Sequence, residues 1–434
     1  GILVEGACKN ITIDSCNIHD IHFSSNAGAS VNSNTNAHGI IVYGTSGTVA
    51  TSNILITNNK LYNCRLGYSE GIAVNGNVDG FTISNNHIYN LTNIGIDAIG
   101  FEGNAPANDQ ARNGIIRHNL VHDCLSAYAT SAGIYVDGGK DILIEQNTIY
   151  KCGYGIEIGC ENKGKTTANI TVRSNVIYNN EQAGIALGGW NYPSESGKVV
   201  TSSVINNTCF KNDYKKSFMG ELYLSYSENC VIQNNILYPS DSKTLCYAEL
   251  GQPGMIFNYN LFYSDNNPAT ISAEWNNVYY NSLNALFTAT KTNQNSIVAN
   301  PLFVNTNITN PDFHIQQGSA AINKGNPLSN DTSLTITDID RQLRYNDTVD
   351  CGADEFYNAS KIYFFTGNGN WDINANWLNK TMPPSPLNAG EQIWITPIKN
   401  GHCILNKEQI INNGASLIIY KNADFKISGD MFLR

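Results

Sequence analysis

The sequence predicts an all-β protein, a right-handed parallel β-helix (a solenoid) followed by a small C-terminal β module. Two short patterns that alternate along the chain, together with the overall composition, lead to this prediction. The 434 residues include 37 Gly and 23 Tyr, are 41% hydrophobic and 14% charged, and carry a formal net charge of −10. The hydrophobic content is too high for a disordered chain, the charged content is too low for a coiled coil, and Gly is not spaced as in collagen.

The first pattern is the motif (Ile/Val)-x-x-Asn-x-apolar-(Tyr/His/Phe/Leu), which runs from Ile56 to Tyr62 at its clearest occurrence. Its repeated Asn residues are Asn59, Asn86, Asn119, Asn147, Asn175, Asn207, Asn235 and Asn260, which lie 25 to 33 residues apart. Neighbouring coils of a β-helix lie about 4.8 Å apart, so side chains at one repeated position can hydrogen-bond to one another. We therefore expect a structural ladder of stacked Asn side chains.

The second pattern, Gly-Ile-x-(Val/Ile/Leu/Ala)-x-Gly, lies between the Asn motifs, for example from Gly39 to Gly44 and from Gly133 to Gly138. Both patterns are short, rich in β-branched residues and bounded by turn residues, as strands are. A leucine-rich repeat has a similar period, but each of its repeats has a helix or turn segment after the strand. A second strand takes that place here, which favours the β-helix.

The repeat fades after about residue 264, and the domain organisation follows from this. We expect a β-helix over residues 1–357, with a segment from about residue 300 that caps its open end. A change in composition then predicts a small β-sandwich-like module over residues 358–434, truncated or complete. The eleven Cys residues contain no CxxC pair, and Cys64, Cys124 and Cys152 share a repeated position with Leu91. These three are therefore expected to be buried packing residues.

The net negative charge argues against nucleic acid and against anionic membranes as partners, because both favour a basic face. No run approaches the roughly 18 to 20 apolar residues that cross a bilayer, so no membrane insertion is expected. The first residues, Gly1 to Glu5, read as the middle of a strand without a cationic leader. We therefore expect a signal peptide and an N-terminal portion to precede them in a monomeric protein that is secreted, periplasmic or at the cell surface.

Acidic residues gather at the predicted outward positions of three consecutive coils. Alternation along the Gly-Ile strands places Asp97, Tyr135 and Glu157 in one outward column and Asp137 in the next. Further polar residues border these strands: His38, Glu70, Glu102, Arg112, Lys140 and Glu161. Solvated surface is the simpler interpretation, but the concentration of carboxylates favours a cleft that binds a cation or a substrate.

The runs from Asn93 to Gly103, Gly133 to Lys140 and Gly155 to Ile158 resemble the pectate-lyase-like β-helix superfamily, and in particular bacterial secreted polysaccharide lyases. The resemblance implies a uronate-containing polysaccharide as substrate and Ca²⁺ as cofactor. The candidate metal ligands are Asp97, Glu102, Asp137, Glu157 and Glu161. It implies β-elimination with Lys140 or Arg112 as the base, and Asp137 and Glu157 as further catalytic candidates.

Two alternatives stay open. In a glycoside hydrolase, paired carboxylates of the same groove would protonate the glycosidic oxygen and activate water or attack the sugar. In a non-catalytic glycan-binding solenoid or adhesin, exposed aromatic rings would hold the sugar. Tyr135 and Trp190 are the candidate sugar contacts in every case, and Glu70 and His38 are further candidates for substrate binding.

Overall fold

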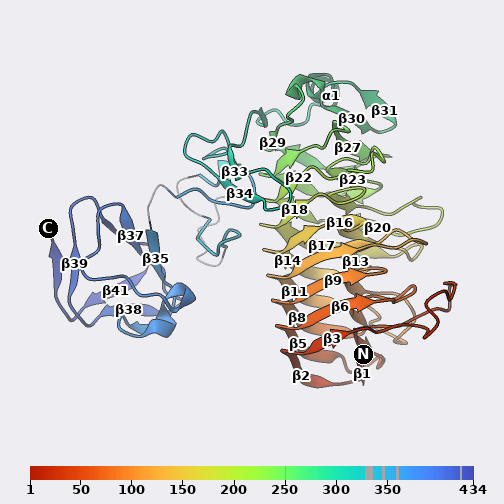
Figure 1. Ribbon diagram of the computed structural model, residues 1–434, viewed down its shortest axis with the longest axis horizontal. Helices are drawn as coiled ribbons and strands as arrows, with labels where there is room; N and C mark the ends of the chain where they lie inside the picture. Colours follow the sequence, from red (N-terminus) through yellow and green to blue (C-terminus); the bar gives the residue numbers. More distant parts are fainter. Residues whose placement is uncertain (250, 328–335, 345–347, 358–360, 421–422) are drawn as a thin grey trace. The chain divides into compact units, whose positions relative to one another are not determined.

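The computed structural model describes residues 1–249, 251–327, 336–344, 348–357, 361–420 and 423–434. It divides into two compact units, which are described separately: residues 1–329 with 348–354, and residues 330–347 with 355–434. In the first unit each coil contributes one strand to each of three parallel sheets, which we call sheets A, B and C (Figure 1). The predicted parallel β-helix is confirmed.

The Gly-Ile pattern forms sheet A. Its strands, in order, are β1 (Ile2–Gly6), β4 (Ile40–Gly44), β7 (Ile72–Gly76), β10 (Ile96–Ile99), β13 (Ala132–Asp137), β16 (Tyr154–Gly159), β19 (Ile185–Leu187), β23 (Leu222–Leu224), β27 (Thr244–Ala248), β30 (Ser272–Trp275) and β31 (Val278–Tyr280). Only the last pair, β30 with β31, is antiparallel among these described strands.

The segments on either side of the repeated Asn form sheets B and C. Sheet B contains β2 (Lys9–Asp14), β5 (Thr51–Thr57), β8 (Val78–Ser84), β11 (Arg112–Arg117), β14 (Lys140–Glu145), β17 (Thr166–Arg173), β21 (Ser203–Ile205), β25 (Val231–Gln233) and β28 (Ile256–Asn258), with β20 (Lys198–Val200) and β24 (Ser227–Glu228) beside it. Sheet C contains β3 (Asn17–His19), β6 (Lys60–Cys64), β9 (His87–Leu91), β12 (Leu120–Cys124), β15 (Thr148–Tyr150), β18 (Val176–Tyr178), β22 (Thr208–Phe210), β26 (Ile236–Tyr238), β29 (Leu261–Phe262) and β32 (Ile297–Val298).

The predicted Asn ladder is present at the turn between sheets B and C. From Asn59 to Asn260, each side-chain amide donates to the Oδ1 atom of the next Asn at 3.0 Å. That Oδ1 atom also accepts the backbone N–H of the preceding Asn, for example Asn119 N to Asn147 Oδ1 at 2.9 Å. The ladder satisfies buried polar groups that would otherwise destabilise the turn, and it fixes the register of successive coils.

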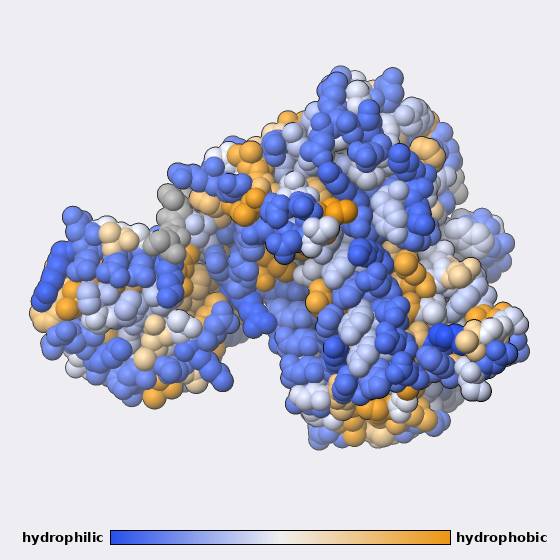
Figure 2. Space-filling view, in the orientation of Figure 1, coloured by the Kyte–Doolittle hydropathy of each residue, from blue (hydrophilic) through white to orange (hydrophobic). Residues whose placement is uncertain are grey.

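Inward Ile, Val, Leu and Cys side chains fill the interior of the solenoid. Cys64, Cys124 and Cys152 are buried within it, as predicted. At the first coil, Ile2 and Val4 are only partly buried against this core. Figure 2 shows hydrophobic surface at this end, whereas most of the remaining visible face is hydrophilic.

The far end of the solenoid is covered differently from the prediction. Helix α1 (Leu283–Thr290) lies beyond the last coils (Figure 1), with Leu283 and Leu286 buried in the core. The Ser282 hydroxyl accepts the Ala285 N–H at 3.3 Å and so caps the start of the helix. A short 3₁₀ turn, η1 (Pro268–Thr270), precedes β30.

The segment predicted to cap the open end instead lies along the flank of the solenoid. Its antiparallel strands β33 (Phe303–Asn305) and β34 (Asp312–Ile315) place Phe303 and Phe313 against Phe210 of sheet C, with ring centroids 6.0 and 4.9 Å apart. Outward-pointing aromatic side chains of sheet C, such as Phe210, offer apolar area that the hairpin covers, so the hairpin is stabilised on the side rather than at the end.

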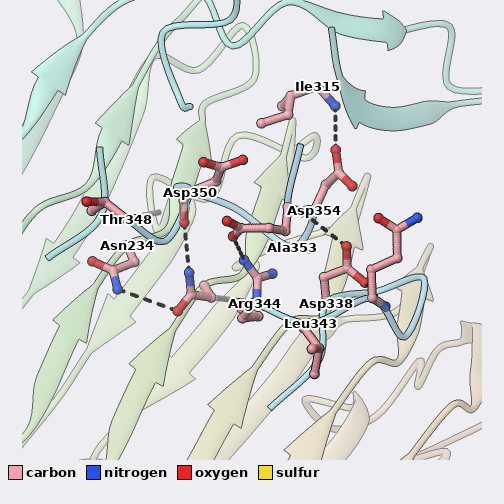
Figure 3. A network of polar contacts seen from close by, with 12 residues as sticks. Asn234, Ile315, Asp338, Leu343, Arg344, Thr348, Asp350, Ala353 and Asp354 are labelled. Atoms are coloured by element: carbon pink, nitrogen blue, oxygen red, sulfur yellow. Dashed lines mark hydrogen bonds and ion pairs between the residues drawn. The ribbon is translucent and has the colours of Figure 1, made fainter. Parts of the chain in front are cut away.

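Residues 348–354 return to the same flank (Figure 3). The Asp354 carboxylate accepts the Ile315 N–H at 2.8 Å, and the Gly352 N–H donates to the Asn234 carbonyl at 2.8 Å. The Asn206 amide donates to the Asp350 carbonyl at 2.9 Å. The last two bonds join two coils to a segment more than 100 residues away in sequence, and the first joins that segment to β34.

The second unit contains eight described strands, all paired in parallel: β35 (Lys361–Phe365), β36 (Gly369–Asn370), β37 (Glu391–Ile395), β38 (His402–Leu405), β39 (Gln409–Ile411), β40 (Ser416–Ile419), β41 (Asp424–Ile427) and β42 (Met431–Leu433). Short 3₁₀ segments, η3 (Asn374–Asn376) and η4 (Leu378–Lys380), follow β36. The buried Trp371 and Trp377 lie in its hydrophobic core. Parallel pairing in three small sheets makes this a second, short solenoid, so the prediction of a sandwich-like module is corrected.

Candidate active site

The outward face of sheet A carries the acidic residues in register. Asp97 of β10 pairs with Tyr135 of β13, and Tyr135 pairs with Glu157 of β16. Their neighbours along each strand, such as Ile96 and Ile134, point into the core. Alternation therefore forces Asp97, Tyr135 and Glu157 to the same outer surface, on three adjacent strands, as the sequence indicated.

An acidic pocket of about 450 Å³ lies at this surface. Five carboxylates line it, from Glu70, Asp97, Glu102, Asp137 and Glu161. Its other lining residues include Asn and Tyr side chains and one basic residue, His38. Among the described residues, no Lys or Arg lines this pocket.

An aromatic pocket of about 540 Å³ adjoins the acidic one, and Thr130, Tyr135 and Glu161 line both. Its walls include Glu157, the exposed Trp190 and further apolar and aromatic side chains. The latter include Tyr154, Met219 and Tyr223. The two pockets form one cleft that has a carboxylate-rich half and an aromatic half.

Burial raises the pKa of the cleft carboxyls. The pKa of Asp97 is well above its ordinary value because the side chain is only 3% exposed, and because Glu70 and Asp137 add negative charge. The pKa of Asp137 is raised in the same way, by burial and by the negative charge of Glu161. Burial and the charge of Glu161 raise the pKa of Glu157 from 4.5 to about 8. Close carboxylates that cannot all be ionised are a feature of acid–base sites and of cation sites.

Hydrogen bonds fix part of the cleft and leave part of it unpaired. The Glu161 N–H donates to Asp137 Oδ1 at 2.7 Å, and the Tyr135 hydroxyl donates to Glu161 Oε1 at 3.4 Å. By contrast, the buried Oδ1 atoms of Asp97 and Asn93 have no hydrogen-bond partner in the described structure. Buried polar atoms are nearly always paired with protein or with ordered water, so these two acceptors are open to a donor from a ligand or from water.

His38 and Glu70, the two predicted substrate-binding residues of the early coils, form one side of the acidic pocket. His38 Nδ1 lies 3.2 Å from Glu70 Oε2, and its Nε2 atom lies 3.3 Å from the Tyr43 hydroxyl. Tyr43 is outward on β4, in the second column with Asn75. The imidazole is thus positioned from both sides at the rim of the carboxylate cluster.

Arg112 and Lys140, the two predicted bases, are not brought to the cleft. Both lie on sheet B, side by side on β11 and β14. Arg112 forms an ion pair with Asp79 at 3.1 Å, and Lys140 lies 3.7 Å from Asp141. The chain turns from sheet A to sheet B at Gly138 and Gly139, so a base placed immediately after this turn belongs to another face.

The predicted Ca²⁺ ligands are divided between the two halves of the cleft. Asp97, Glu102, Asp137 and Glu161 line the acidic pocket, whereas Glu157 lines the aromatic pocket together with Glu161. The oxygen donors suit a hard cation. Within the described ranges, however, no three of these carboxylates offer oxygens within 4.8 Å of one another. A cation would therefore require waters or side-chain movement to complete its coordination.

Some residues of the cleft were not predicted from the sequence. Asn93, Tyr154 and Tyr223 were not singled out, although Tyr223 occupies the column of Glu157, two strands further along, through Ala186. Extending the Gly-Ile pattern to the run from Glu221 to Leu224, in which Glu replaces Gly, would have identified it. Tyr154 precedes Gly155 and lies just outside the motif.

Comparisons with known proteins support the fold. Residues 1–197 match the family model described as "Right handed beta helix region". A Bacillus subtilis (strain 168) protein described as "Uncharacterized protein YwoF" is 37% identical over 312 residues, which are 70% of this chain and 64% of that protein. The chain thus spans 64% of the length of this curated relative. Among the helices that the structure describes, none is long and apolar enough to cross a membrane.

Solved structures with similar folds include pectate lyase Pel9A, which is 13% identical with a TM-score of 0.38 and covers 80% of this chain and 87% of its own. The A-module of the mannuronan C-5 epimerase AlgE4 of Azotobacter vinelandii is 12% identical with a TM-score of 0.29, covering 61% and 86%. Likenesses at this level do not establish a shared activity. The family match and the three parallel sheets confirm the predicted right-handed parallel β-helix.

Proposed function

We propose that this protein hydrolyses a polysaccharide in the cleft on sheet A, with Glu157 as the general acid and Glu161 as the general base. The observation that carries the proposal is that the aromatic pocket brings these two carboxyl groups together with Trp190. A concave, partly apolar surface with a few convergent polar groups is typical of ligand sites. Aromatic rings supply the apolar faces on which sugar rings pack.

Burial raises the pKa of both carboxyl groups, but the hydrogen bond from Tyr135 lowers that of Glu161, so the two groups can take opposite roles. Glu157, with a pKa of about 8, retains its proton at neutral pH and can donate it to the glycosidic oxygen as the bond to the anomeric carbon breaks. Water then attacks that carbon and transfers a proton to the Glu161 carboxylate, whose Oε1 atom accepts from Tyr135. The glycosidic bond is broken, the hydroxyl of the water joins the anomeric carbon, and the leaving sugar keeps the proton from Glu157.

Cation-assisted β-elimination is a second candidate, favoured by the unpaired Oδ1 atoms of Asp97 and Asn93. Together with oxygens of Asp137 and Glu161 they are the kind of ligand that Ca²⁺ takes, and waters or side-chain movement would have to complete the shell. When bound, the ion would neutralise a uronate carboxylate and acidify the neighbouring carbon. His38 would be the base, since no Lys or Arg lines either pocket in the described chain.

A polymer substrate fits an exported protein, and export forms part of the proposal. The test is to incubate the protein with pectate, alginate and neutral and amino-sugar polymers, with and without EDTA. We expect new reducing ends without ultraviolet absorbance from unsaturated uronides, and no effect of EDTA. Unsaturated products that require Ca²⁺ would replace hydrolysis with elimination, and binding without products would leave a glycan-binding solenoid.

The variant E157Q tests the assigned acid, and E274Q is its matched control. Glu274 of β30 occupies the same outward column as Glu157, four strands further along, but lines neither pocket. Loss of turnover in E157Q alone supports the site. Equal loss in both variants, or in neither, contradicts it.

A further inference from the structure

We infer that the acidic pocket binds a sugar residue that carries a free ammonium group, so that the substrate is a polymer containing N-unsubstituted amino sugars. This inference rests on the proposed hydrolysis and adds a substrate class to it. It concerns the acidic half of the cleft, whereas the proposed acid, Glu157, lines the aromatic half and the proposed base, Glu161, lines both halves.

The charge of the acidic pocket is the first argument. Among the residues that the structure describes, five carboxyl groups and one basic side chain line it, and that side chain, His38, lies 3.2 Å from Glu70. A uronate would bring a further negative charge into this enclosure and would be repelled without a companion cation. A neutral sugar would leave the carboxylates uncompensated. An ammonium group is complementary to them.

The unpaired acceptors are the second argument. Asp97 Oδ1 belongs to a side chain that is 3% exposed and lines the pocket, and Asn93 Oδ1 belongs to one that is 2% exposed. An ammonium group has three donors and no acceptor, so it can satisfy both atoms and one further oxygen. Its hydrogen bonds to a carboxylate are charge-assisted and therefore strong.

The arrangement of the carboxylates favours ammonium over a divalent metal. Ca²⁺ takes six to eight oxygen ligands in one shell. In the part of the chain that the structure describes, no three pocket carboxylates offer oxygens within 4.8 Å of one another. An ammonium group needs only two or three acceptors, and Asp97 and Asn93 already supply two that are unpaired.

The acidic pocket also lies at the right place to act on substrate choice. Tyr135, Thr130 and Glu161 line both pockets, so a chain bound across the cleft would place neighbouring sugars in the two halves. An N-acetylated sugar has lost the positive charge and two of the three donors at nitrogen. Losing one charge-assisted contact costs roughly tenfold or more in binding.

The test uses the full chain carrying E157Q, which should slow turnover about 10²–10⁴-fold, with glucosamine and galactosamine oligomers in N-unsubstituted and N-acetylated forms. Titration calorimetry should show at least about tenfold tighter binding of an unsubstituted oligomer. Adding D97N should remove most of that preference and leave binding of the acetylated oligomer unchanged. E70Q provides a second variant if D97N fails to fold, and E274Q should change nothing.

Several outcomes overturn the inference: no binding of either amine oligomer, equal or tighter binding of the acetylated forms, or a preference that survives both D97N and E70Q. Binding of CaCl2 that D97N abolishes, without binding of amines, assigns the pocket to a metal instead. Cleavage by the wild-type protein of polymers without amines, in the absence of amine binding, refutes this inference and leaves the proposed hydrolysis standing. Amine binding without cleavage of any polymer refutes the proposed hydrolysis and leaves the assignment of the acidic pocket to an ammonium group standing.

Discussion

Replacing the Glu157 carboxyl with an amide should abolish most of the activity and remove its alkaline pH limit. E157Q keeps the shape of the side chain but cannot donate a carboxylic proton. The loss of a general acid typically lowers kcat by about 10²–10⁴-fold. The pocket walls are unchanged, so KM should change much less than kcat.

The expected pH dependence follows from the environment of Glu157. With a pKa of about 8 instead of 4.5, roughly nine-tenths of the side chains carry the proton at pH 7, compared with about three in a thousand without the shift. The acid works only while protonated. On the alkaline side of the pH profile, the rate should therefore be retained up to about pH 8 and then fall about tenfold for each further pH unit.

The assay is the initial rate of reducing-end release from a cleaved polymer between pH 5 and 10, for wild type, E157Q and the control E274Q. We expect the alkaline fall in wild type and E274Q and its absence from the residual rate of E157Q. A wild-type rate that increases through pH 8, or an E157Q rate within a factor of three of wild type, would refute the assignment of Glu157 as the acid.

Three further predictions concern stability and binding. N147A removes four hydrogen bonds of the buried ladder and should lower the free energy of unfolding, measured in urea, by about 2–6 kcal/mol. The control N284A, on the exposed face of α1, should change it by less than about 1 kcal/mol. Similar losses in the two variants would contradict a stabilising role for the ladder. Burial raises the pKa of the fully buried Glu221 from 4.5 to about 8. Its contribution to the free energy of unfolding is therefore complete below pH 4.5 and is lost as the pH rises to about 8, by at most about 5 kcal/mol. E221Q should flatten the dependence of unfolding free energy on pH over this window, and an unchanged slope would count against it. W190A should raise KM about 3–10-fold with kcat nearly constant, and a reversed split in steady-state kinetics would remove Trp190 from sugar binding.

Much of the fold and part of the site could be predicted from the sequence because both depend on repetition. The spacing of Asn59 and its counterparts predicts the ladder, and the two-residue alternation predicts that Asp97, Tyr135 and Glu157 share a surface. Alternation cannot say on which sheet a residue after a turn lies, so Arg112 and Lys140 were misplaced as cleft residues.

The second unit and the flank hairpin follow from packing rather than from periodicity. The second unit has too few coils for a repeat to stand out, and its Gly and Trp residues are typical of several small β folds. Phe303 and Phe313 indicate an apolar hairpin in the sequence, but the outward-pointing Phe210 of sheet C, which the hairpin covers, determines where it packs. The partners of such segments lie far away along the chain.

The Asn ladder restricts how the length of this protein can change. Each rung is completed by the next coil, so inserting or deleting a whole coil preserves the hydrogen bonding, whereas adding a few residues within one interrupts it. A whole-coil change between Asp97 and Glu157 would preserve the ladder but alter the cleft. Losing the intervening coil would remove Tyr135 and Asp137 and merge the two halves of the groove that we propose hold neighbouring sugars.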